Sequence, residues 1–305
     1  MQMKPFKSMN DIIKKAEEIG PKTCIVAGSY KESEVEAALI ARDKGMIKPI
    51  FIGDSEIMNK FPSLNEDEVI GEDSPMEAAI KAVKFCSEGK GDFLLKGSIS
   101  TSHFLKPILC DEYGLRDAPL LSHIVILDIP GLGRLIAITD GGMCITPTIL
   151  EKISILNNGV NFMHSLGIEE PRVGILSAIE MVNPKIGNTI DASIIEKAAN
   201  RGQIPGCIVD GPLAFDLMFS DYACEVKGIN TPVCGKVDLI LVPDITTGNS
   251  VAKALIHFGR ALAAGVILGT KKPVVMLSRA DRPEIKLNSI ALGVVLCSSD
   301  RSGVQ

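Results

Sequence analysis

The stretch TCIVAGSYKESEVEAALIARDKGMIKPIFI, residues 23–52, sets the pattern that the rest of the chain repeats. Thr23–Ala27 and Pro49–Ile52 are short β-branched runs of the kind found in buried strands. Ser33–Lys44 lies between them with the apolar spacing of a helix, and Ser33 is its expected N-cap, with Glu36 three residues on. A strand, a helix and a strand in this order predict parallel strands joined by a crossover helix.

The same alternation continues along the chain. A helix is predicted over Ser74–Gly89, where Ser74 caps, Pro75 takes the first helical position and Glu77 completes a capping box. Asp92–Leu95 is the strand expected after it. Helices and strands that alternate in this way favour a mostly parallel sheet with helices on both faces.

Two β-rich runs interrupt the alternation. His123–Asp128 and Arg134–Thr139 are joined by IPGLG and predict an antiparallel hairpin. Beyond it, strands are expected at Arg172–Leu176, Cys207–Val209, Leu239–Val242, Val266–Leu268 and Val274–Leu277, and helices at Thr148–Leu166, Asp191–Arg201, Asn249–Leu262 and Lys286–Cys297. We predict an α/β fold of two lobes, formed by residues 1–146 with 284–305 and by residues 147–283. Ligands of such sheets bind beyond the carboxyl ends of the strands, so the active site is expected in the cleft between the lobes.

Composition excludes several classes of function. The chain has 305 residues, 46% of them hydrophobic, which is enough for a buried core. A net charge of -5, no Trp and three Tyr argue against nucleic-acid binding. No stretch reaches the roughly 20 apolar residues of a membrane helix, and the N-terminus has no signal-type run, so a cytoplasmic protein that binds no membrane is expected.

The eight Cys and four His show no metal-binding spacing. There is no C-x-x-C pair, and no two His stand four residues apart. We therefore expect no metal site and no bound cofactor, and cysteines that remain unpaired thiols in a reducing cytosol.

Polar, glycine-bearing loops follow several of the expected strands. The loop that runs from Lys96 and Gly97 to Thr101 could hold a phosphate with its backbone N–H groups, although an ordinary helix-capping loop reads the same way. Comparable loops contain Thr139 and Asp140; Asp210, Gly211 and Pro212; and Gly248 and Asn249. Each is a weak signal alone, because Asp and Gly are common turn residues.

Ser278-Arg279-Ala280-Asp281 combines three kinds of group within four residues. Acyl transfer between a thiol and a phosphate needs a base, donors for a developing oxyanion, and a cation that holds phosphoryl oxygens. A surface ion pair between Arg279 and Asp281 is the alternative from these residues alone. The first strand is followed by Ala27-Gly28-Ser29-Tyr30, without the G-x-G-x-x-G of a nicotinamide site, and there is no P-loop, H-E-x-x-H or G-x-S-x-G motif.

The order and spacing of these segments resemble the phosphate acetyl/butyryltransferase family, and its butyryltransferase branch most closely. The resemblance covers nearly the whole chain. It is carried by Lys96-Gly97, Gly114-Leu115-Arg116, Ser122-His123, Thr139-Asp140, Asn157-Asn158, Asp210-Gly211-Pro212-Leu213-Ala214, Gly235-Lys236, Thr247-Gly248-Asn249 and Ser278-Arg279-Ala280-Asp281. It implies a fold like that of isocitrate and isopropylmalate dehydrogenases and the reversible reaction of acyl-CoA with phosphate to give acyl phosphate and CoA.

The resemblance also implies a mechanism and a set of site residues. The CoA thiolate attacks the acyl phosphate directly in a ternary complex, CoA is a substrate, and the protein is a homo-oligomer, at least a dimer. Ser278 and Arg279 match the pair that holds the acyl phosphate. Residues expected to contact substrate are Lys96, Gly97, Thr101, Thr139, Asp140, Asp210, Gly211, Pro212, Lys236, Gly248 and Asn249.

Two positions depart from the family pattern. The catalytic Asp of the acetyltransferases falls on Ile285 here, and the nearby carboxylates are Asp281 and Glu284, so Asp281 is our hypothesis for the base. Cys144 stands where relatives often have Asn, and it is expected to be an inert packing residue rather than a nucleophile.

Three other functions remain open at this point. They are a phosphate acetyltransferase, an NAD-dependent dehydrogenase on the same fold, and a non-catalytic CoA-binding regulatory protein. The acyl group favoured by the resemblance is butyryl or a branched C4 or C5 chain. Chain length itself is weakly encoded, because one buried methylene contributes only about 0.8 kcal/mol.

Overall fold

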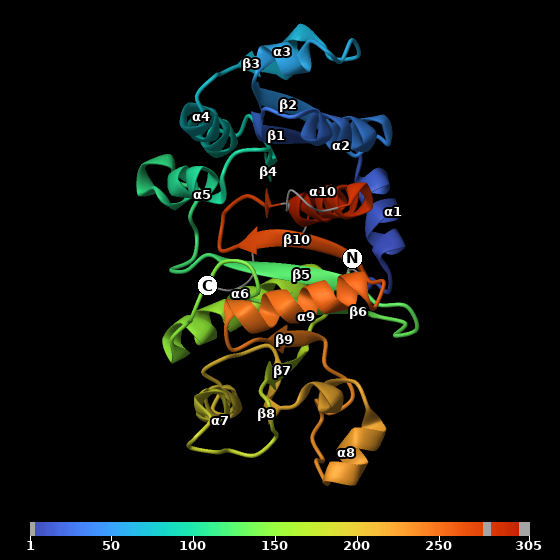
Figure 1. Cartoon of the computed structure of the whole chain (residues 1–305), viewed down its shortest axis with the longest axis vertical. Coiled ribbons are helices and arrows are strands. Elements are labelled where there is room, and N and C mark those ends of the chain that lie inside the picture. The colour runs from blue at the N-terminus through green and yellow to red at the C-terminus, as the bar shows by residue number, and fades with distance from the viewer. Residues whose placement is uncertain (1–3, 277–281, 299–305) are drawn as a thin grey trace. The chain divides into compact units, whose positions relative to one another are not determined.

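The computed structural model describes residues 4–276 and 282–298, and the chain divides into two compact units (Figure 1). The β1 unit comprises Met9–Ala118 and the chain from Ala263 onward. The β6 unit comprises Pro119–Leu262 and the residues before Met9. In the described part of the chain no helix is long and apolar enough to cross a membrane.

The β1 unit is a mostly parallel sheet between two layers of helices. Its strands lie in the order β3-β2-β1-β4-β11-β10, and only β10 runs antiparallel to its neighbour β11. Its elements are α1 (Met9–Ile19), β1 (Lys22–Ser29), α2 (Glu32–Asp43), β2 (Ile47–Gly53), α3 (Ser55–Met58), β3 (Val69–Gly71), α4 (Pro75–Ser87), β4 (Phe93–Lys96), α5 (Thr101–Leu109), β10 (Leu262–Leu268), β11 (Val274–Val275) and α10 (Pro283–Ser298). Figure 1 shows α4 and α5 on one side of the strands and α2 and α10 on the other.

The β6 unit has the strand order β5-β6-β9-β7-β8. All of its pairs are parallel except the hairpin of β5 and β6. Its elements are β5 (Ser122–Asp128), β6 (Leu135–Thr139), α6 (Ile149–Ser165), β7 (Arg172–Leu176), α7 (Gly187–Asn200), β8 (Ile208–Leu213), α8 (Asp221–Lys227), β9 (Leu239–Leu241) and α9 (Ile245–His257). The expected class, an α/β fold with mostly parallel sheets and one hairpin, is confirmed.

Local signals in the sequence mark most elements correctly. Ser74 caps α4 by accepting from the Glu77 N–H, as predicted. Glu77 does not complete the expected capping box, because the Ser74 N–H donates to Glu72 Oε1 at 3.2 Å instead. Ser33 is not the N-cap, because α2 begins at Glu32. The N-cap position therefore falls on Lys31, two residues before Ser33, and Lys31 makes no side-chain cap. The helix expected to end at Leu262 ends at His257, and Leu262 instead opens the buried strand β10.

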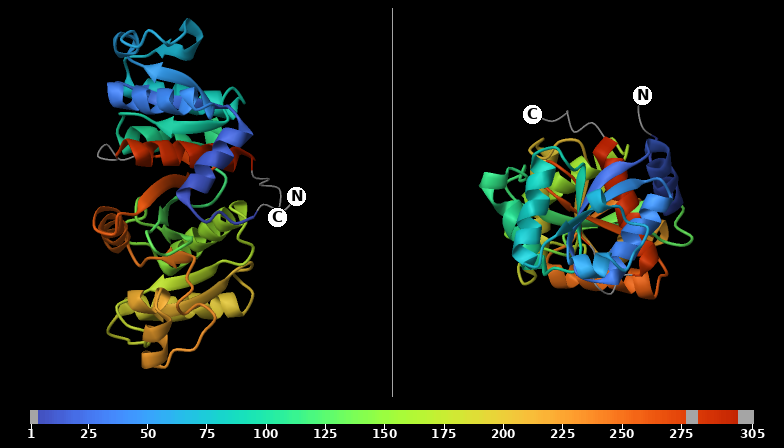
Figure 2. Two further views of the ribbon diagram at one scale, coloured as in Figure 1. Left: turned by 90° about the vertical axis from the view of Figure 1, so that its right-hand side faces the viewer. Right: turned by 90° about the horizontal axis from the view of Figure 1, so that it is seen from above.

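The division into units differs from the boundaries expected near residues 146 and 284. The hairpin joins the β6 unit because β6 pairs with β9, far along the chain, whereas β11 joins the β1 unit because it pairs with β4. These pairings depend on residues more than a hundred positions apart, and no local pattern encodes them. The C-terminal helix α10 does return to the N-terminal part, where it packs against α1 and α2 (Figure 2).

Candidate functional site

In the β1 unit, β1, β2 and β4 are parallel and end at one edge of the sheet. In the turns that follow β1 and β4, two positions have no room for a Cβ atom. A Cβ on Gly97 would stand 2.4 Å from the Gly28 carbonyl oxygen, and one on Gly28, whose φ is +81°, would stand 2.2 Å from Ile99. Glycine is therefore required at both turns, and it brings the loop after β4 against the loop after β1.

Lys96 is the last residue of β4 and is only 4% exposed. Its Nζ donates to the carbonyl oxygen of Gly97 at 3.3 Å, so the ammonium group is turned toward the loop that follows the strand. A buried ammonium at the end of a parallel strand is suited to holding an anion, because charge interactions strengthen where water is excluded.

The loop after Lys96 leads directly into the N-terminus of α5. Gly97 and Ser98 donate their backbone N–H groups to the strand-end carbonyls of Ala27 and Gly28, each at 2.9 Å. Ser100 caps α5, and the next residue, Thr101, is exposed at the first helical position. The structure thus places Lys96, Gly97 and Thr101 in one turn from strand to helix. The N–H groups of Gly97 and Ser98 are used by the strand, so the N–H donors left for the predicted phosphate site are those of the first turn of α5, and phosphate binding here stays a prediction.

The predicted catalytic residues Ser278, Arg279 and Asp281 lie outside the described residues. The described chain ends before them at residue 276 and resumes after them at residue 282. β11 runs parallel to β4 with Val275 beside Leu95, and α10 begins at Pro283.

In the β6 unit, Asp140 holds the loop that follows the carboxyl end of β6. It follows the last residue of β6, is 2% exposed, and accepts backbone N–H groups on both carboxylate oxygens. Gly142 and Met143 donate to Oδ1 at 2.8 and 2.9 Å, and His123 and Cys144 donate to Oδ2 at 2.9 and 3.4 Å. This geometry makes the side chain the centre of the loop at residues 140–144 (below, the Asp140 loop); its contact with a substrate stays a prediction.

The N-terminus of α9 packs against the Asp140 loop. A Cβ on Gly248 would stand 2.7 Å from the Gly141 Cα, so two backbones touch here. Asn249 Nδ2 donates to the Gly141 carbonyl oxygen at 3.2 Å, and Asp244 caps α9 by accepting from the Thr247 N–H at 2.8 Å. Of the predicted residues, the structure therefore brings Thr139, Asp140, Gly248 and Asn249 together.

Two of these organising contacts escaped the sequence reasoning. The N-cap of α9 could have been found from the sequence, because Asp244 lies three residues before Thr247, which is the usual spacing of a cap and the N–H that it accepts. The backbone contact of His123 with Asp140 had no local signal, because it depends on the pairing of β5 with β6.

Asp210, Gly211, Pro212 and Lys236 lie elsewhere in the β6 unit. The first three belong to β8, at the edge of this unit's strand order, and Asp210 accepts from Thr231 Oγ1 at 2.6 Å. Lys236 is exposed and lies before β9 in the chain, whereas Gly248 lies after β9. Lys236 and Gly248 are therefore at opposite ends of this strand. These four predicted residues are not gathered with Asp140.

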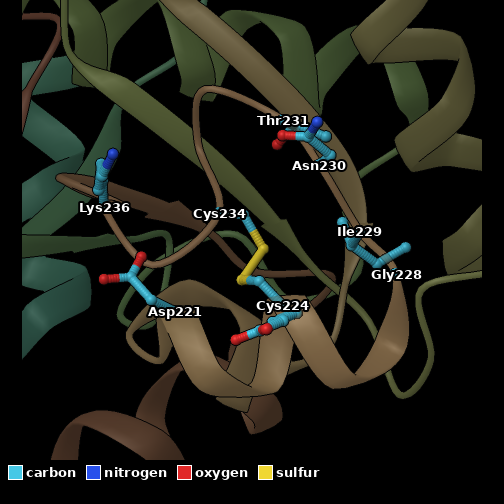
Figure 3. A pocket seen from close by; sticks show the side chains of 9 residues that line it. Asp221, Cys224, Gly228, Ile229, Asn230, Thr231, Cys234 and Lys236 are labelled. Atoms are coloured by element: carbon cyan, nitrogen blue, oxygen red, sulfur yellow. A yellow bond between two sulfur atoms is a disulfide. The ribbon is translucent and has the colours of Figure 1, made fainter.

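A polar pocket of about 390 Å³ lies beside Lys236 (Figure 3). Its wall includes a disulfide between Cys224 and Cys234, with Asp221 on one side and Thr231 on the other. The disulfide corrects the expectation that every cysteine is an unpaired thiol. The pair forms because the turn after α8 brings together two residues ten apart in sequence. Within the described residues the other six cysteines form no disulfide.

Cys144 is half-buried in the Asp140 loop, and its Sγ lies 3.6 Å from the Leu121 carbonyl oxygen. Burial, and then the negative charge of Asp140, raise the pKa of its thiol to about 12. A thiol of this pKa stays protonated near neutral pH, so Cys144 is a poor nucleophile. Within the described residues no group of three or more His, Cys, Asp or Glu could hold a metal ion.

Replacing Asp140 by Asn is expected to lower the free energy of unfolding by about 1–3 kcal/mol, because the amide nitrogen cannot accept from the backbone donors that now face it. Urea denaturation measures the loss. Asp244→Asn is the matched control, since Asn caps a helix as well as Asp does. Equal stabilities of the two variants would contradict the organising role of Asp140.

Comparison with known proteins places the chain among acyltransferases. The model of the family described as phosphate acetyl/butaryl transferase matches residues 68–294. The chain is 38% identical to the phosphate butyryltransferase of Clostridium acetobutylicum over 96% of this chain and 99% of that one. It is 39% identical to the phosphate acetyltransferase of Thermotoga maritima over 90% and 95% of the two chains.

The structure is similar to a solved one. The crystal structure of a branched-chain phosphotransacylase from Enterococcus faecalis V583 aligns with a TM-score of 0.82 and 30% identity, over 91% of this chain and 99% of that one. A likeness in fold alone extends to the 4-hydroxythreonine-4-phosphate dehydrogenase of Klebsiella pneumoniae, with a TM-score of 0.54 and 10% identity over 90% of this chain and 99% of that one. This agrees with the isocitrate dehydrogenase-like architecture expected above.

Proposed function

This chain belongs to the phosphate acetyl/butyryltransferase family, and we propose that it transfers a butyryl or branched C4–C5 acyl group reversibly between coenzyme A and inorganic phosphate. That it is a phosphate butyryltransferase-like acyltransferase follows from the comparisons. The acyl group is our inference, and the observation that carries it is the full-length match to a phosphate butyryltransferase, supported by the likeness to a branched-chain phosphotransacylase.

The proposed reaction is a direct displacement at the acyl carbon. The CoA thiolate attacks the carbonyl carbon of the acyl phosphate, a C–S bond forms, and the C–O bond to phosphate breaks with its electron pair leaving on the phosphate oxygen. Asp281 takes the thiol proton. In the reverse direction phosphate attacks the thioester and CoA leaves.

The β1 unit supplies the proposed phosphate contacts. The buried ammonium of Lys96 and the N-terminal turn of α5 provide positive charge and N–H donors where phosphoryl oxygens would bind. Ser278 and Arg279 are proposed to hold the acyl phosphate, with the planar Arg group contacting two oxygens. These roles, and those of the Asp140 loop, Asp210–Pro212 and Lys236, stay predictions.

The oligomeric state and the location also stay predictions. We propose a homo-oligomer, at least a dimer, that works in the cytoplasm on acyl-CoA and phosphate as substrates. The 39% identity to a phosphate acetyltransferase keeps acetyl transfer as the second candidate.

The deciding measurement is CoA release from acetyl-, butyryl- and isobutyryl-CoA, with and without phosphate, followed with a thiol reagent. We expect release that depends on phosphate and is fastest with a C4 substrate. Fastest release from acetyl-CoA would favour the second candidate. Release that ignores phosphate would indicate a thioesterase, and no release would indicate a non-catalytic CoA-binding protein.

A further inference from the structure

Helix α6 holds the chain at the start of β5. The side-chain amide of Asn158 donates from Nδ2 to the Leu120 carbonyl oxygen at 2.9 Å and to Ser122 Oγ at 3.0 Å. Both N–H bonds of one amide are therefore directed at a single short segment. Ser122 is fully buried, so its hydroxyl depends on partners within the protein.

The same turn of α6 lies close to the end of β6. At Gly159, a Cβ would stand 3.0 Å from Leu239 Cδ2 and 3.4 Å from Thr139 Cγ2. Glycine at this position lets the helix approach the strands at Thr139, the residue directly before Asp140. Asn158 and Gly159 together therefore set the distance of α6 from the point where β5 begins and β6 ends.

From the start of β5, hydrogen bonds lead on to Asp140. Thr139 Oγ1 donates to the His123 carbonyl oxygen at 3.0 Å, and the His123 N–H donates to Asp140 Oδ2 at 2.9 Å. The imidazole of His123 lies against Gly142, where a Cβ would stand 2.7 Å from Nδ1. A shift of His123 would therefore move both the Asp140 carboxylate and the loop around it.

We propose that Asn158 is a positioning residue for the transfer reaction. Its hydrogen bonds to Leu120 and Ser122 fix the start of β5. The next residue, His123, then fixes the Asp140 loop, and this loop contacts the N-terminus of α9 through Asn249. The inference rests on the proposed function, in which Thr139 and Asp140 belong to the substrate site. Asn158 acts on geometry, and a displacement of about 1 Å at reacting groups can cost far more rate than stability.

The test changes the donors of Asn158 without changing its size. Asn158→Asp turns the group facing the Leu120 carbonyl oxygen into an acceptor. We expect kcat for CoA release to fall about tenfold, with KM for acyl-CoA and for phosphate changed by less than about threefold. Asn157→Asp, one residue earlier on α6, carries the same change of charge and is expected to keep kcat within about twofold.

Ser122→Ala gives a second, milder variant, which removes one of the two acceptors and keeps the test open if Asn158→Asp does not fold. Because both residues act through a shared hydrogen bond, the double variant should lose no more activity than Asn158→Asp alone. Thermal unfolding of each variant shows that the assays compare folded proteins.

Three results would overturn the inference: kcat of folded Asn158→Asp within about twofold of wild type, an equal loss in Asn157→Asp, or single effects that simply multiply in the double variant. Should Asn158→Asp not fold, unchanged kcat in Ser122→Ala would count against it equally. A wild-type chain without phosphate-dependent CoA release would refute the proposed function, and this inference with it. An active wild type beside an unaffected Asn158→Asp would refute the inference alone.

Discussion

Asp281→Asn is expected to lower kcat at least about 100-fold, while KM for CoA changes little. Removal of a positioned general base costs about 100- to 10,000-fold where proton transfer accompanies attack. The amide keeps the size of the side chain but cannot take the proton of the CoA thiol. The measurement is thioester formation from butyryl phosphate and CoA at saturating substrate.

Glu284→Gln is the matched control, because Glu284 is the other carboxylate near Ile285, the position to which the family resemblance assigns the base. It is exposed in the first turn of α10, and its replacement should leave kcat within about twofold of wild type. An undiminished kcat in Asp281→Asn, or a larger loss in Glu284→Gln, would sink the assignment of the base.

Lys96→Met is expected to lower kcat/KM for phosphate about 100-fold. Losing one preorganised charged donor at developing or bound charge costs about 10²- to 10³-fold. Met preserves the buried apolar stem of a residue that is 4% exposed, so the fold should persist. Initial rates over a range of phosphate concentrations give the effect, and thermal unfolding verifies the folded state.

Lys106→Met is the matched control, because it removes one positive charge from α5 at a position away from the predicted phosphate site. Lys106 is exposed in the last turn of α5 and carries the same charge ten residues away. Its variant should keep kcat/KM for phosphate within about twofold of wild type. Equal losses in the two variants would point to a general electrostatic effect, and an unchanged value in Lys96→Met would contradict the phosphate cradle.

The sequence by itself determined most of the elements and the family. Ser74 and Glu77 mark the start of α4, and the IPGLG run marks the hairpin of β5 and β6, since caps and turns depend on residues within a few positions of one another. The motifs that carry the family resemblance are likewise local. The turn that carries Lys96, Gly97 and Thr101 could be predicted for the same reason, because a strand end, a loop and a helix start are contiguous in the chain; its binding of phosphate stays a prediction.

Only the tertiary structure decided which strands pair and which side chains meet. The place of β11 beside β4, the contact of Gly141 with Gly248, and the distance of Lys236 from Asp140 all depend on strand order. The same holds for the two hydrogen bonds of Asn158. Such contacts join residues far apart in the chain and are selected by the packing of whole elements, which no short run of sequence encodes.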